Sequence, residues 1–374
     1  MKIGIDARLW NETGVGRYVR SLYQYLPELD DQNEYIWFFL EKEYGEIKMP
    51  HKNWRKVKAN IRWHTLAEQL LLPWIFYKEK LDLLHFPYFS FPILYPRKFV
   101  IHIYDLIYDH YKTAKDSTLP FWLFSLKKFG YHFITWSSMI RASAIMTLSE
   151  DAKSEIVDHY HINPGKIFIT YESGKLENKP TGLKKSRGKI KQLKPYILYV
   201  GSAHSHKNLE NLILATKRLA EKQKNIKLVL IGNDDFFYPR LKKFVHRNKL
   251  TDQVIFVGFV PNSDLAAWYQ SAICFATASN MEGFGIPPLE AMSVGCPVIV
   301  SNIPVFREIY GNAAVYFNQN DPKDIAKTIS TTIADQKFVR NMIEKGYKQT
   351  SLYSWKKTIE DTVEVYKKMG AFKS

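Results

Sequence analysis

Two glutamates eight positions apart enclose a turn rich in glycine and proline, in the stretch 280-NMEGFGIPPLEAMSVG-295. Glu282 precedes the turn and Glu290 follows it. Gly283 and Gly285 have no Cβ, so the backbone there can approach a ligand closely. The proline pair that follows suits the first turn of a helix, where a missing N–H breaks no hydrogen bond. Carboxylates on both sides of such a turn can accept hydrogen bonds from sugar hydroxyls while the turn contacts a phosphate.

The neighbouring segments place this turn at the edge of a parallel sheet. Residues 272–279 read as a strand, a helix follows the prolines as far as Gly295, and residues 297–301 read as the next strand. Open α/β sheets bind ligands at the carboxyl ends of their strands, and a helix N-terminus attracts phosphate. A nucleotide-sugar offers the matching order of groups: a sugar, a diphosphate and a ribose. A tight turn with two solvated glutamates is the alternative, since glycine-rich loops are common.

Short apolar runs alternate with helical patterns along the rest of the chain. We predict further strands at 2–5, 99–103, 144–149, 196–200, 227–231 and 254–258, and a helix at 205–222. This alternation is typical of α/β proteins with parallel sheets covered by helices on both faces. The 374 residues exceed one ordinary core. The sequence therefore predicts two domains.

A basic segment separates two stretches in which predicted strands and helices alternate. Residues 176–194 contain seven Lys or Arg and one acid, together with Pro and two Gly, which predicts a solvated linker; a nuclear-localisation segment is the alternative. The predicted domains are therefore 1–175 and 195–354, and residues 355–374 form a terminal amphipathic helix. The net charge of +16 favours nucleic acid, an anionic membrane or a phosphorylated ligand as a partner.

Several motifs in register resemble one enzyme family. The E-x7-E stretch is similar to the signature of the family 4 retaining glycosyltransferases, which have the GT-B fold. Blocks at 3–22, 147–173, 197–215, 257–273 and 301–317 resemble that family in the same order. The resemblance implies two Rossmann-like parallel-sheet domains facing across a cleft. The N-terminal domain would bind the acceptor and the C-terminal domain the nucleotide-sugar, with the terminal helix packed back on the N-terminal domain.

The resemblance also implies roles for individual residues. Glu282 should contact the hydroxyls of the transferred sugar, and Glu290 should hold the ribose. The backbone at Phe284, Gly285 and Ile286 should cradle the distal phosphate and sugar.

Lys207 matches the lysine that pairs with the diphosphate, where a cation offsets the charge that develops on the leaving group. An ordinary surface lysine is the alternative. The family commonly has an arginine near this lysine, whereas Ser202 and His206 stand at those positions here. A protonated or donating His206 would substitute in part, as a weaker and pH-dependent cation. Arg240 or Arg307 would otherwise have to help from elsewhere.

A second departure follows the strand at 99–103. The family has a His-Asp pair there, but this chain has Tyr104 and Asp105. We expect the Tyr104 hydroxyl to take the place facing the sugar, ahead of His102, which shares a strand face with it. Asp105 is expected to support the loop as a cap. In enzymes of this type the departing phosphate is thought to accept the proton of the acceptor, so a missing histidine need not abolish catalysis.

The first loop carries two glycines that the resemblance places opposite the phosphate, Gly14 and Gly16. Asp6 and Arg8 just before them are expected to hold the loop as an ion pair. The fragment GVGRY lacks the third glycine of the dinucleotide fingerprint, which argues against an NAD enzyme.

No cofactor and no metal requirement are expected. No D-x-D run ends a strand, and the scattered histidines lack zinc spacing. Cys274 and Cys296 lie in apolar surroundings and suggest neither a disulfide nor a metal cluster, which favours a reducing cytoplasm. The opening MKIGIDARL does not resemble a signal peptide, and no apolar run is long enough to span a membrane.

The acceptor side of the predicted enzyme contains two aromatic and basic segments, 70–98 and 121–143. Such segments favour either a domain core or a peripheral contact with a membrane carrying a lipid-linked acceptor. The function expected is transfer of a hexose from a nucleotide-sugar to a glycan or lipid-linked acceptor. GDP-mannose is favoured over UDP-glucose and UDP-GlcNAc.

Three alternatives stay open at this point. One is a non-transferring relative such as an epimerase or a phosphorylase. Another is a transferase impaired by the changes at Tyr104 and His206. A nucleic-acid-binding protein is suggested by charge alone, and no recognised nucleic-acid module is found.

Overall fold

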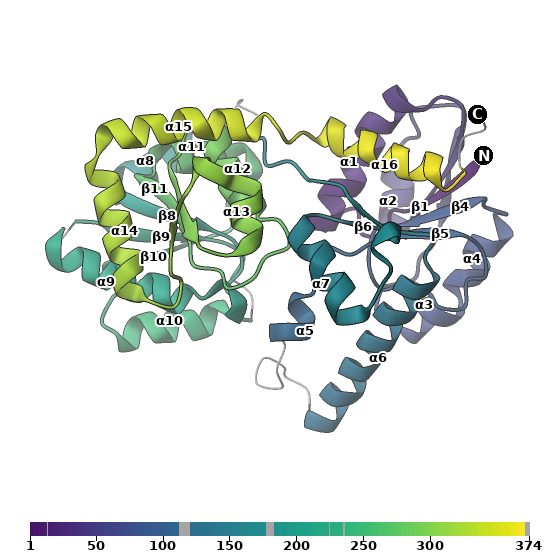
Figure 1. Ribbon diagram of the computed structural model, residues 1–374, viewed down its shortest axis with the longest axis horizontal. Coiled ribbons are helices and arrows are strands. Elements are labelled where there is room, and N and C mark those ends of the chain that lie inside the picture. The colour runs from purple at the N-terminus through teal and green to yellow at the C-terminus, as the bar shows by residue number, and fades with distance from the viewer. Residues whose placement is uncertain (13, 112–119, 177–182, 224, 235, 371–374) are drawn as a thin grey trace. The chain divides into compact units, whose positions relative to one another are not determined.

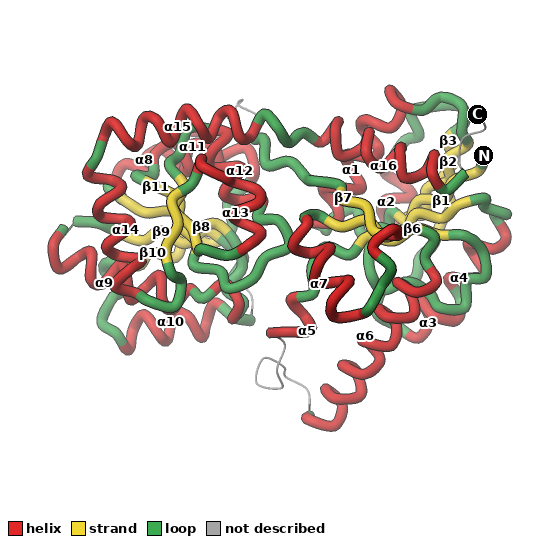
Figure 2. Tube along the Cα trace, in the orientation of Figure 1, coloured by secondary structure: helices red, strands yellow, loops and turns green. Residues whose placement is uncertain are grey.

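The computed structural model describes residues 1–370 except residues 13, 112–119, 177–182, 224 and 235. The chain divides into two units, shown in Figures 1 and 2. Unit 1 comprises Met1–Glu172 and Trp355–Ser374, and unit 2 comprises Ser173–Ser354. Each unit is a parallel sheet with helices around it, so the predicted α/β class is confirmed.

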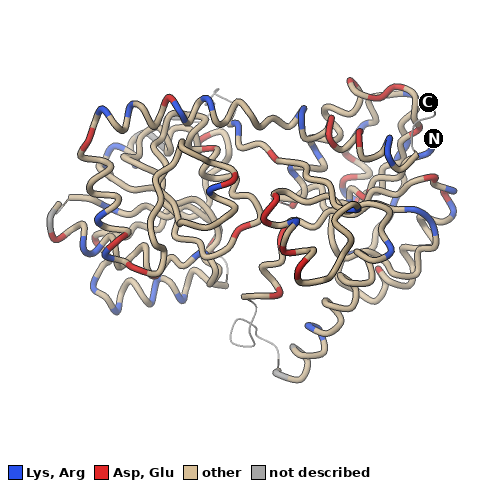
Figure 3. Tube along the Cα trace, in the orientation of Figure 1, with Lys and Arg blue, Asp and Glu red and all other residues tan. Residues whose placement is uncertain are grey.

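The sheet of unit 1 has seven strands in the order β3-β2-β1-β4-β5-β6-β7, and every strand pair is parallel. The strands are β1 Lys2–Asp6, β2 Glu34–Phe39, β3 Trp54–Lys58, β4 Leu83–Phe86, β5 Phe99–His102, β6 Ala144–Thr147 and β7 Ile167–Ile169. The helices are α1 Gly14–Leu29, α2 Glu41–Glu46, α3 Leu66–Leu70, α4 Leu72–Lys78, α5 Ile107–Tyr111, α6 Phe121–Arg141, α7 Glu150–Tyr160 and α16 Trp355–Lys368. Helix α6 contains no acidic residue, and Figure 3 draws it without red.

The last helix completes the core of unit 1. Helix α16 packs on α1, and Ile359 and Val363 join the apolar cluster beneath the sheet. The hydroxyl of Tyr18 on α1 lies 2.8 Å from that of Thr362 on α16. The terminal helix thus lies on the N-terminal sheet, as the resemblance implies, while residues 371–374 are outside the described part.

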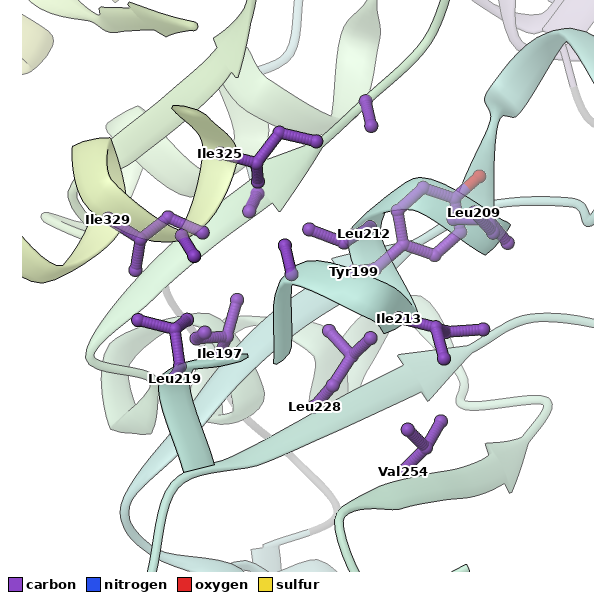
Figure 4. Packing of buried hydrophobic residues seen from close by; sticks show 14 of the residues in the cluster. Ile197, Tyr199, Leu209, Leu212, Ile213, Leu219, Leu228, Val254, Ile325 and Ile329 are labelled. Carbon is purple, nitrogen blue, oxygen red and sulfur yellow. The ribbon is translucent and has the colours of Figure 1, made fainter. Parts of the chain in front are cut away.

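The sheet of unit 2 has six parallel strands in the order β10-β9-β8-β11-β12-β13. The strands are β8 Tyr196–Val200, β9 Lys227–Ile231, β10 Val254–Gly258, β11 Cys274–Thr277, β12 Val298–Ser301 and β13 Val315–Phe317. The helices are α8 Leu183–Leu193, α9 Leu209–Lys222, α10 Tyr238–Arg247, α11 Asn262–Ser271, α12 Ile286–Ser293, α13 Pro304–Tyr310, α14 Pro322–Ala334 and α15 Gln336–Thr350. Figure 4 shows the core in which Ile197 and Leu228 of the strands meet Leu212 of α9 and Ile325 of α14.

The predicted linker is wrong for residues 183–193, which form helix α8 within unit 2. Ile190 and Leu193 of this helix are buried, and the helix packs against α11. The many lysines led to the prediction of a solvated linker. The few apolar residues between them recur at helical spacing and form one apolar face. The predicted linker residues 177–182 lie outside the described part of the chain.

Each sheet reverses its strand order at one point. In unit 1 the reversal lies between β1 and β4, and in unit 2 it lies between β8 and β11. In open α/β sheets, such a reversal at the carboxyl edge is where ligands usually bind. The loops after β8 and β11 contain Lys207 and Glu282, respectively.

Candidate functional site

The loops that follow β8 and β11 in unit 2 are joined through their backbones. The amide of Asn280 donates a hydrogen bond of 2.8 Å to the carbonyl oxygen of His206. Lys207 lies in a short 3-10 turn, Ser205–Lys207, and Asn208 follows it with a left-handed φ of 51° before α9 begins. This reversal aims Lys207 and the start of α9 at the β11 loop.

Lys207 and Glu282 form a tight ion pair. The ammonium nitrogen of Lys207 lies 2.7 Å from each carboxylate oxygen of Glu282. The Ser279 hydroxyl donates to the same carboxylate over 2.7 Å, and Thr277 hydrogen-bonds to Ser279 over 2.9 Å. Burial alone would raise the pKa of Glu282, but Lys207, His206 and Ser279 together hold it below its usual value. The site therefore contains an ionised carboxylate beside a cation.

Helix α12 begins directly after the glycine turn, as the proline pair predicts. Gly285 precedes the helix with a φ of +88°, in the region that favours glycine. Its carbonyl oxygen accepts a hydrogen bond of 2.6 Å from the Tyr310 hydroxyl. A Cβ at Gly285 would collide with that hydroxyl and come within 2.8 Å of Phe306. No side chain caps the helix start.

The second glutamate of the motif lies one turn into α12. Glu290 is 3% exposed, and its Oε2 accepts a hydrogen bond of 3.0 Å from the Tyr269 hydroxyl on α11. The Phe284 side chain is buried against Tyr353, so only its backbone is available for the predicted contact. The ribose role of Glu290 and the phosphate roles of Phe284, Gly285 and Ile286 stay predictions.

Ser202 and His206 occupy the places where the family has an arginine. The carbonyl of Ser202 accepts a hydrogen bond of 2.7 Å from the Tyr199 hydroxyl, which fixes the loop after β8. Burial and the neighbouring Lys207 lower the pKa of His206 to about 3. His206 is therefore neutral near pH 7, and the hypothesis that it acts as a protonated substitute for arginine is not supported.

The two arginines considered as replacements lie on other elements. Arg307 of α13 donates a hydrogen bond of 2.7 Å to Asn302, and its guanidinium lies 3.7 Å from the ring centre of Tyr316. Arg240 of α10 lines a separate cavity together with Lys243 and Arg247. Neither arrangement joins the pair of Lys207 and Glu282.

The expected ion pair of the first loop in unit 1 is confirmed and is larger than predicted. Arg8 binds both oxygens of Asp6 and also lies 2.8 Å from Glu68 of α3, with all three side chains buried. Gly14 and Gly16 lie in the first turn of α1. A Cβ at Gly16 would come within 2.7 Å of the Leu9 carbonyl oxygen. The phosphate-facing role of both glycines stays a prediction.

A cavity of about 670 Å³ lies beside the end of β5 in unit 1. Tyr104 and Asp105 line it, and the Tyr104 ring stacks on His102 with ring centres 4.5 Å apart. The Tyr104 hydroxyl is covered and has no hydrogen-bond partner among the described residues. Its predicted place facing the sugar stays a prediction.

The two neighbours of Tyr104 have structural roles. His102 is fully buried, with its Nε2 3.2 Å from the Thr170 hydroxyl. Asp105 caps the start of α5 by accepting a hydrogen bond of 3.0 Å from the Ile107 amide, as predicted.

The described residues contain neither a cluster of metal ligands nor a membrane-spanning helix. Among those residues, no group of three or more His, Cys, Asp or Glu side chains could hold a metal ion. Cys274 and Cys296 are both free and buried. No described helix combines the length and the apolar character needed to cross a bilayer.

Several residues that build these sites were not predicted from the sequence. Ser279 and Thr277 support Glu282, Tyr269 contacts Glu290, and Tyr310 fixes Gly285. A serine three residues before a glutamate gives no distinctive signal, and the tyrosines are distant in sequence. Glu68 of the Arg8 cluster was also not predicted, although an acid in the first turn of a helix is a weak sequence signal.

Comparison with known proteins gives a family match within unit 2. Residues 183–349 match the family described as glycosyl transferases group 1. The O-antigen chain mannosyltransferase RfbU of Salmonella typhimurium is 33% identical to this chain over 198 residues, which cover 53% of each protein. The O-antigen chain mannosyltransferase B of Escherichia coli is 28% identical over 235 residues, which cover 62% of each. The match thus spans about half to three fifths of these relatives.

Solved structures share the whole fold at low sequence identity. A sucrose-phosphate synthase from Thermosynechococcus elongatus superposes with a TM-score of 0.79 and 17% identity, covering 99% of both chains. WaaG, a glycosyltransferase involved in lipopolysaccharide biosynthesis, gives a TM-score of 0.71 at 14% identity and covers 98% of this chain and 99% of its own. HepE of Anabaena, solved with UDP and glucose, gives 0.73 at 15% identity over the full length of both. The GT-B fold is therefore confirmed.

Proposed function

We propose, on the premise that residues 183–349 match the glycosyl transferases group 1 family in a chain of GT-B fold, that this protein is a retaining glycosyltransferase. It transfers a hexose from a nucleotide-sugar to a glycan or a lipid-linked acceptor in polysaccharide or glycolipid assembly. GDP-mannose is the donor we favour. The mannosyltransferase relatives in O-antigen synthesis support both the sugar and the process.

The observation that carries the proposal is the pair of Lys207 and Glu282 at the strand-order reversal of unit 2. A diphosphate needs a cation, and a hexose needs hydrogen-bond acceptors for its hydroxyls. When the ion pair separates, Lys207 can bind the diphosphate and Glu282 can accept hydrogen bonds from the hexose. The uncapped start of α12 next to it adds partial positive charge for a phosphate.

In the proposed reaction the donor replaces Glu282 as the partner of Lys207. The ammonium group binds the diphosphate and stabilises the charge that grows on it as the bond between C1 of the sugar and the phosphate oxygen breaks. Glu282 accepts hydrogen bonds from the sugar hydroxyls, and Glu290 accepts them from the ribose. The acceptor oxygen forms its bond to C1 on the face that the phosphate leaves, and its proton passes to the departing phosphate oxygen.

We further propose that the reaction needs no metal ion and no protein general base. Lys207 supplies the charge that a metal would otherwise supply. The acceptor would bind unit 1, where Tyr104 and Asp105 line the cavity. The enzyme would work in the cytoplasm with a peripheral contact to a membrane, and nucleic acid is not among the proposed partners.

Transfer can be tested with GDP-mannose, UDP-glucose and UDP-GlcNAc and with lipid-linked or oligosaccharide acceptors, in the presence of a chelator. NMR of the anomeric proton of the product tests retention. Glu282→Gln and Lys207→Ala should lower the rate by about a hundredfold or more. The matched surface changes Glu344→Gln and Lys345→Ala on α15 should not, since both residues are exposed. Donor hydrolysis or epimerisation without transfer, or full transfer by Glu282→Gln, would contradict the proposal.

A further inference from the structure

Helix α6 exposes a continuous row of large apolar side chains. Its exposed apolar residues recur every three or four positions along one side and keep between 45% and 70% of their surface accessible: Trp122, Leu126, Phe129, Phe133, Trp136 and Ile140. The residues that α6 buries include Thr135, Ser138 and Met139. A helix on a water-facing surface normally places its large apolar residues on the core and its polar residues outside. The outer side of α6 therefore needs a covering partner.

Unit 1 carries a second group of exposed apolar residues on α3, on α4 with the residue between these helices, and on the segment after β4: Leu66, Leu70, Leu71, Trp74, Tyr77 and Leu94. Hydrogen bonds connect the two groups. The Gln69 side chain of α3 accepts from the Ile93 amide over 3.1 Å, and Arg141 of α6 donates to the carbonyl oxygens of Ile93 and Tyr95. The two groups thus lie on elements that contact one another, and we call them together the apolar face.

The charges around the apolar face are basic. Helix α6 bears Lys127, Lys128 and Arg141 and no acid, and α4 ends at the exposed Lys78 (Figure 3). The acid of α3, Glu68, is buried against Arg8 and does not reach the surface. A partner that matches this face is apolar inside and anionic at its rim.

We propose that the apolar face docks unit 1 onto a bilayer surface that contains anionic lipid. The tryptophan and phenylalanine side chains would enter the boundary between headgroups and acyl chains, and the basic residues would contact the headgroups. A second copy of the chain fits less well, because a symmetric contact would set the same basic residues against each other. The face lies flat on the bilayer in this arrangement and does not cross it.

The docked arrangement brings the cavity of unit 1 to the membrane surface. Leu66 of the apolar face, which is 80% exposed, and the neighbouring Lys127 of α6 also line the cavity, whose lining extends to Tyr104 and Asp105. An acceptor anchored in the bilayer can therefore place its polar end in the cavity without leaving the membrane. This part rests on the proposed function, whereas the docking itself does not.

The test is flotation of the full chain with vesicles of phosphatidylglycerol and phosphatidylethanolamine, and with vesicles of phosphatidylcholine. The protein should float with the anionic vesicles, and high salt should weaken the binding. Phe133→Ser with Trp136→Ser should lower the partition coefficient by about tenfold or more. Phe338→Ser with Leu352→Ser removes comparably exposed apolar residues from unit 2 and should leave it unchanged.

Two further measurements make each outcome decisive. Thermal unfolding and nucleotide-sugar binding should be the same in both double variants, because all four side chains are at least 45% exposed. The docking proposal would be overturned if the protein failed to float with anionic vesicles or if both double variants bound them equally. It would also be overturned if the protein did not bind vesicles but formed a dimer that Phe133→Ser with Trp136→Ser dissociates. Vesicle binding without any nucleotide-sugar binding would keep the docking and reject the proposed function.

Discussion

Lys207 lies 2.7 Å from both carboxylate oxygens of Glu282, and the pair joins the loops after the two strands at which the sheet of unit 2 reverses its order. The two side chains are only 18% and 13% exposed, so each charge compensates the burial of the other. In the proposed reaction, a diphosphate that binds Lys207 would release Glu282 to accept hydrogen bonds from a sugar. The pair is thus both a structural link and a closed form of the proposed site.

Removing one member of this pair should cost more stability than removing both charges. Lys207→Ala leaves a buried carboxylate without its cation, which we expect to lower the free energy of unfolding by about 1–3 kcal/mol. Lys207→Ala combined with Glu282→Gln removes that charge as well and should recover part of the loss. Urea unfolding of the four proteins of the cycle measures the difference, and strict additivity would contradict a direct interaction.

Lys207→Ala should also reverse the sign of the pH dependence that Glu282 gives to the free energy of unfolding. In the wild type the pKa of Glu282 is lowered, so its contribution is present above about pH 4.5 and is lost as the pH falls further. In Lys207→Ala burial dominates and the pKa rises. The variant should then lose stability as the pH rises above about 4.5, because the unfolded chain ionises first. Unfolding at a series of pH values checks the sign, and parallel curves would argue against the assignment.

Gly285→Ala should disrupt the turn before α12. The φ of +88° is costly for alanine, and the new Cβ would strike the Tyr310 hydroxyl. We expect a loss of at least about 1 kcal/mol in the free energy of unfolding and weaker nucleotide binding. Tyr310→Phe in the same chain should restore part of it. Gly45→Ala in α2, whose Cβ meets no atom within 4 Å, is the control and should be close to neutral.

Arg8→Met should be among the most destabilising changes in unit 1. It would leave the carboxylates of Asp6 and Glu68 buried without their shared cation, at a cost of about 3–5 kcal/mol. The exposed pair of Lys58 and Glu41 provides the comparison, and Lys58→Ala should change stability by less than about 1 kcal/mol. Chemical denaturation measures both, and similar losses for the two variants would refute a structural role for the buried cluster.

Donor binding should not depend on the protonation of His206. Its pKa of about 3 lies below the usual 6.5, so the unfolded chain takes up a proton first as the pH falls between these values. The wild type should therefore lose stability toward low pH more steeply than His206→Asn, by up to about 1.4 kcal/mol per pH unit. Nucleotide affinity should stay level from pH 6 to 8 in both proteins, to within about twofold. A decline in wild-type affinity as the pH rises through 6.5 would favour a charged His206 instead.

Much of the fold could be predicted because its central strands are continuous apolar runs. The strands β1, β5, β6, β8, β9, β10, β11 and β12 lie where the runs predict them. Strands β2, β3, β4, β7 and β13 were not predicted. β3 shows why, since its sequence WRKVK mixes charged and apolar residues at a partly exposed edge of the sheet. Helix α8 was missed because its lysines outnumber the few residues it buries.

Site residues that lie close together in the sequence could be predicted. Contacts between segments that are distant in the sequence could not. Glu282, Gly285 and Glu290 follow one another in a short stretch, so spacing alone reveals them. The contact of Lys207 with Glu282 spans 75 positions and was not predicted, since the resemblance implied only that each residue contacts the donor. The contact of Tyr269 with Glu290 depends on how α11 packs beside α12, which no sequence pattern specifies.

The measurement that tests the central claim most directly is calorimetric titration of the chain with GDP-, UDP-, ADP- and dTDP-sugars, with magnesium and with a chelator. We predict that one nucleotide-sugar, GDP-mannose first, binds selectively and equally well without the metal. Lys207→Ala should weaken that binding by about tenfold or more. Absence of binding by every nucleotide-sugar, or unchanged affinity in Lys207→Ala, would contradict the account.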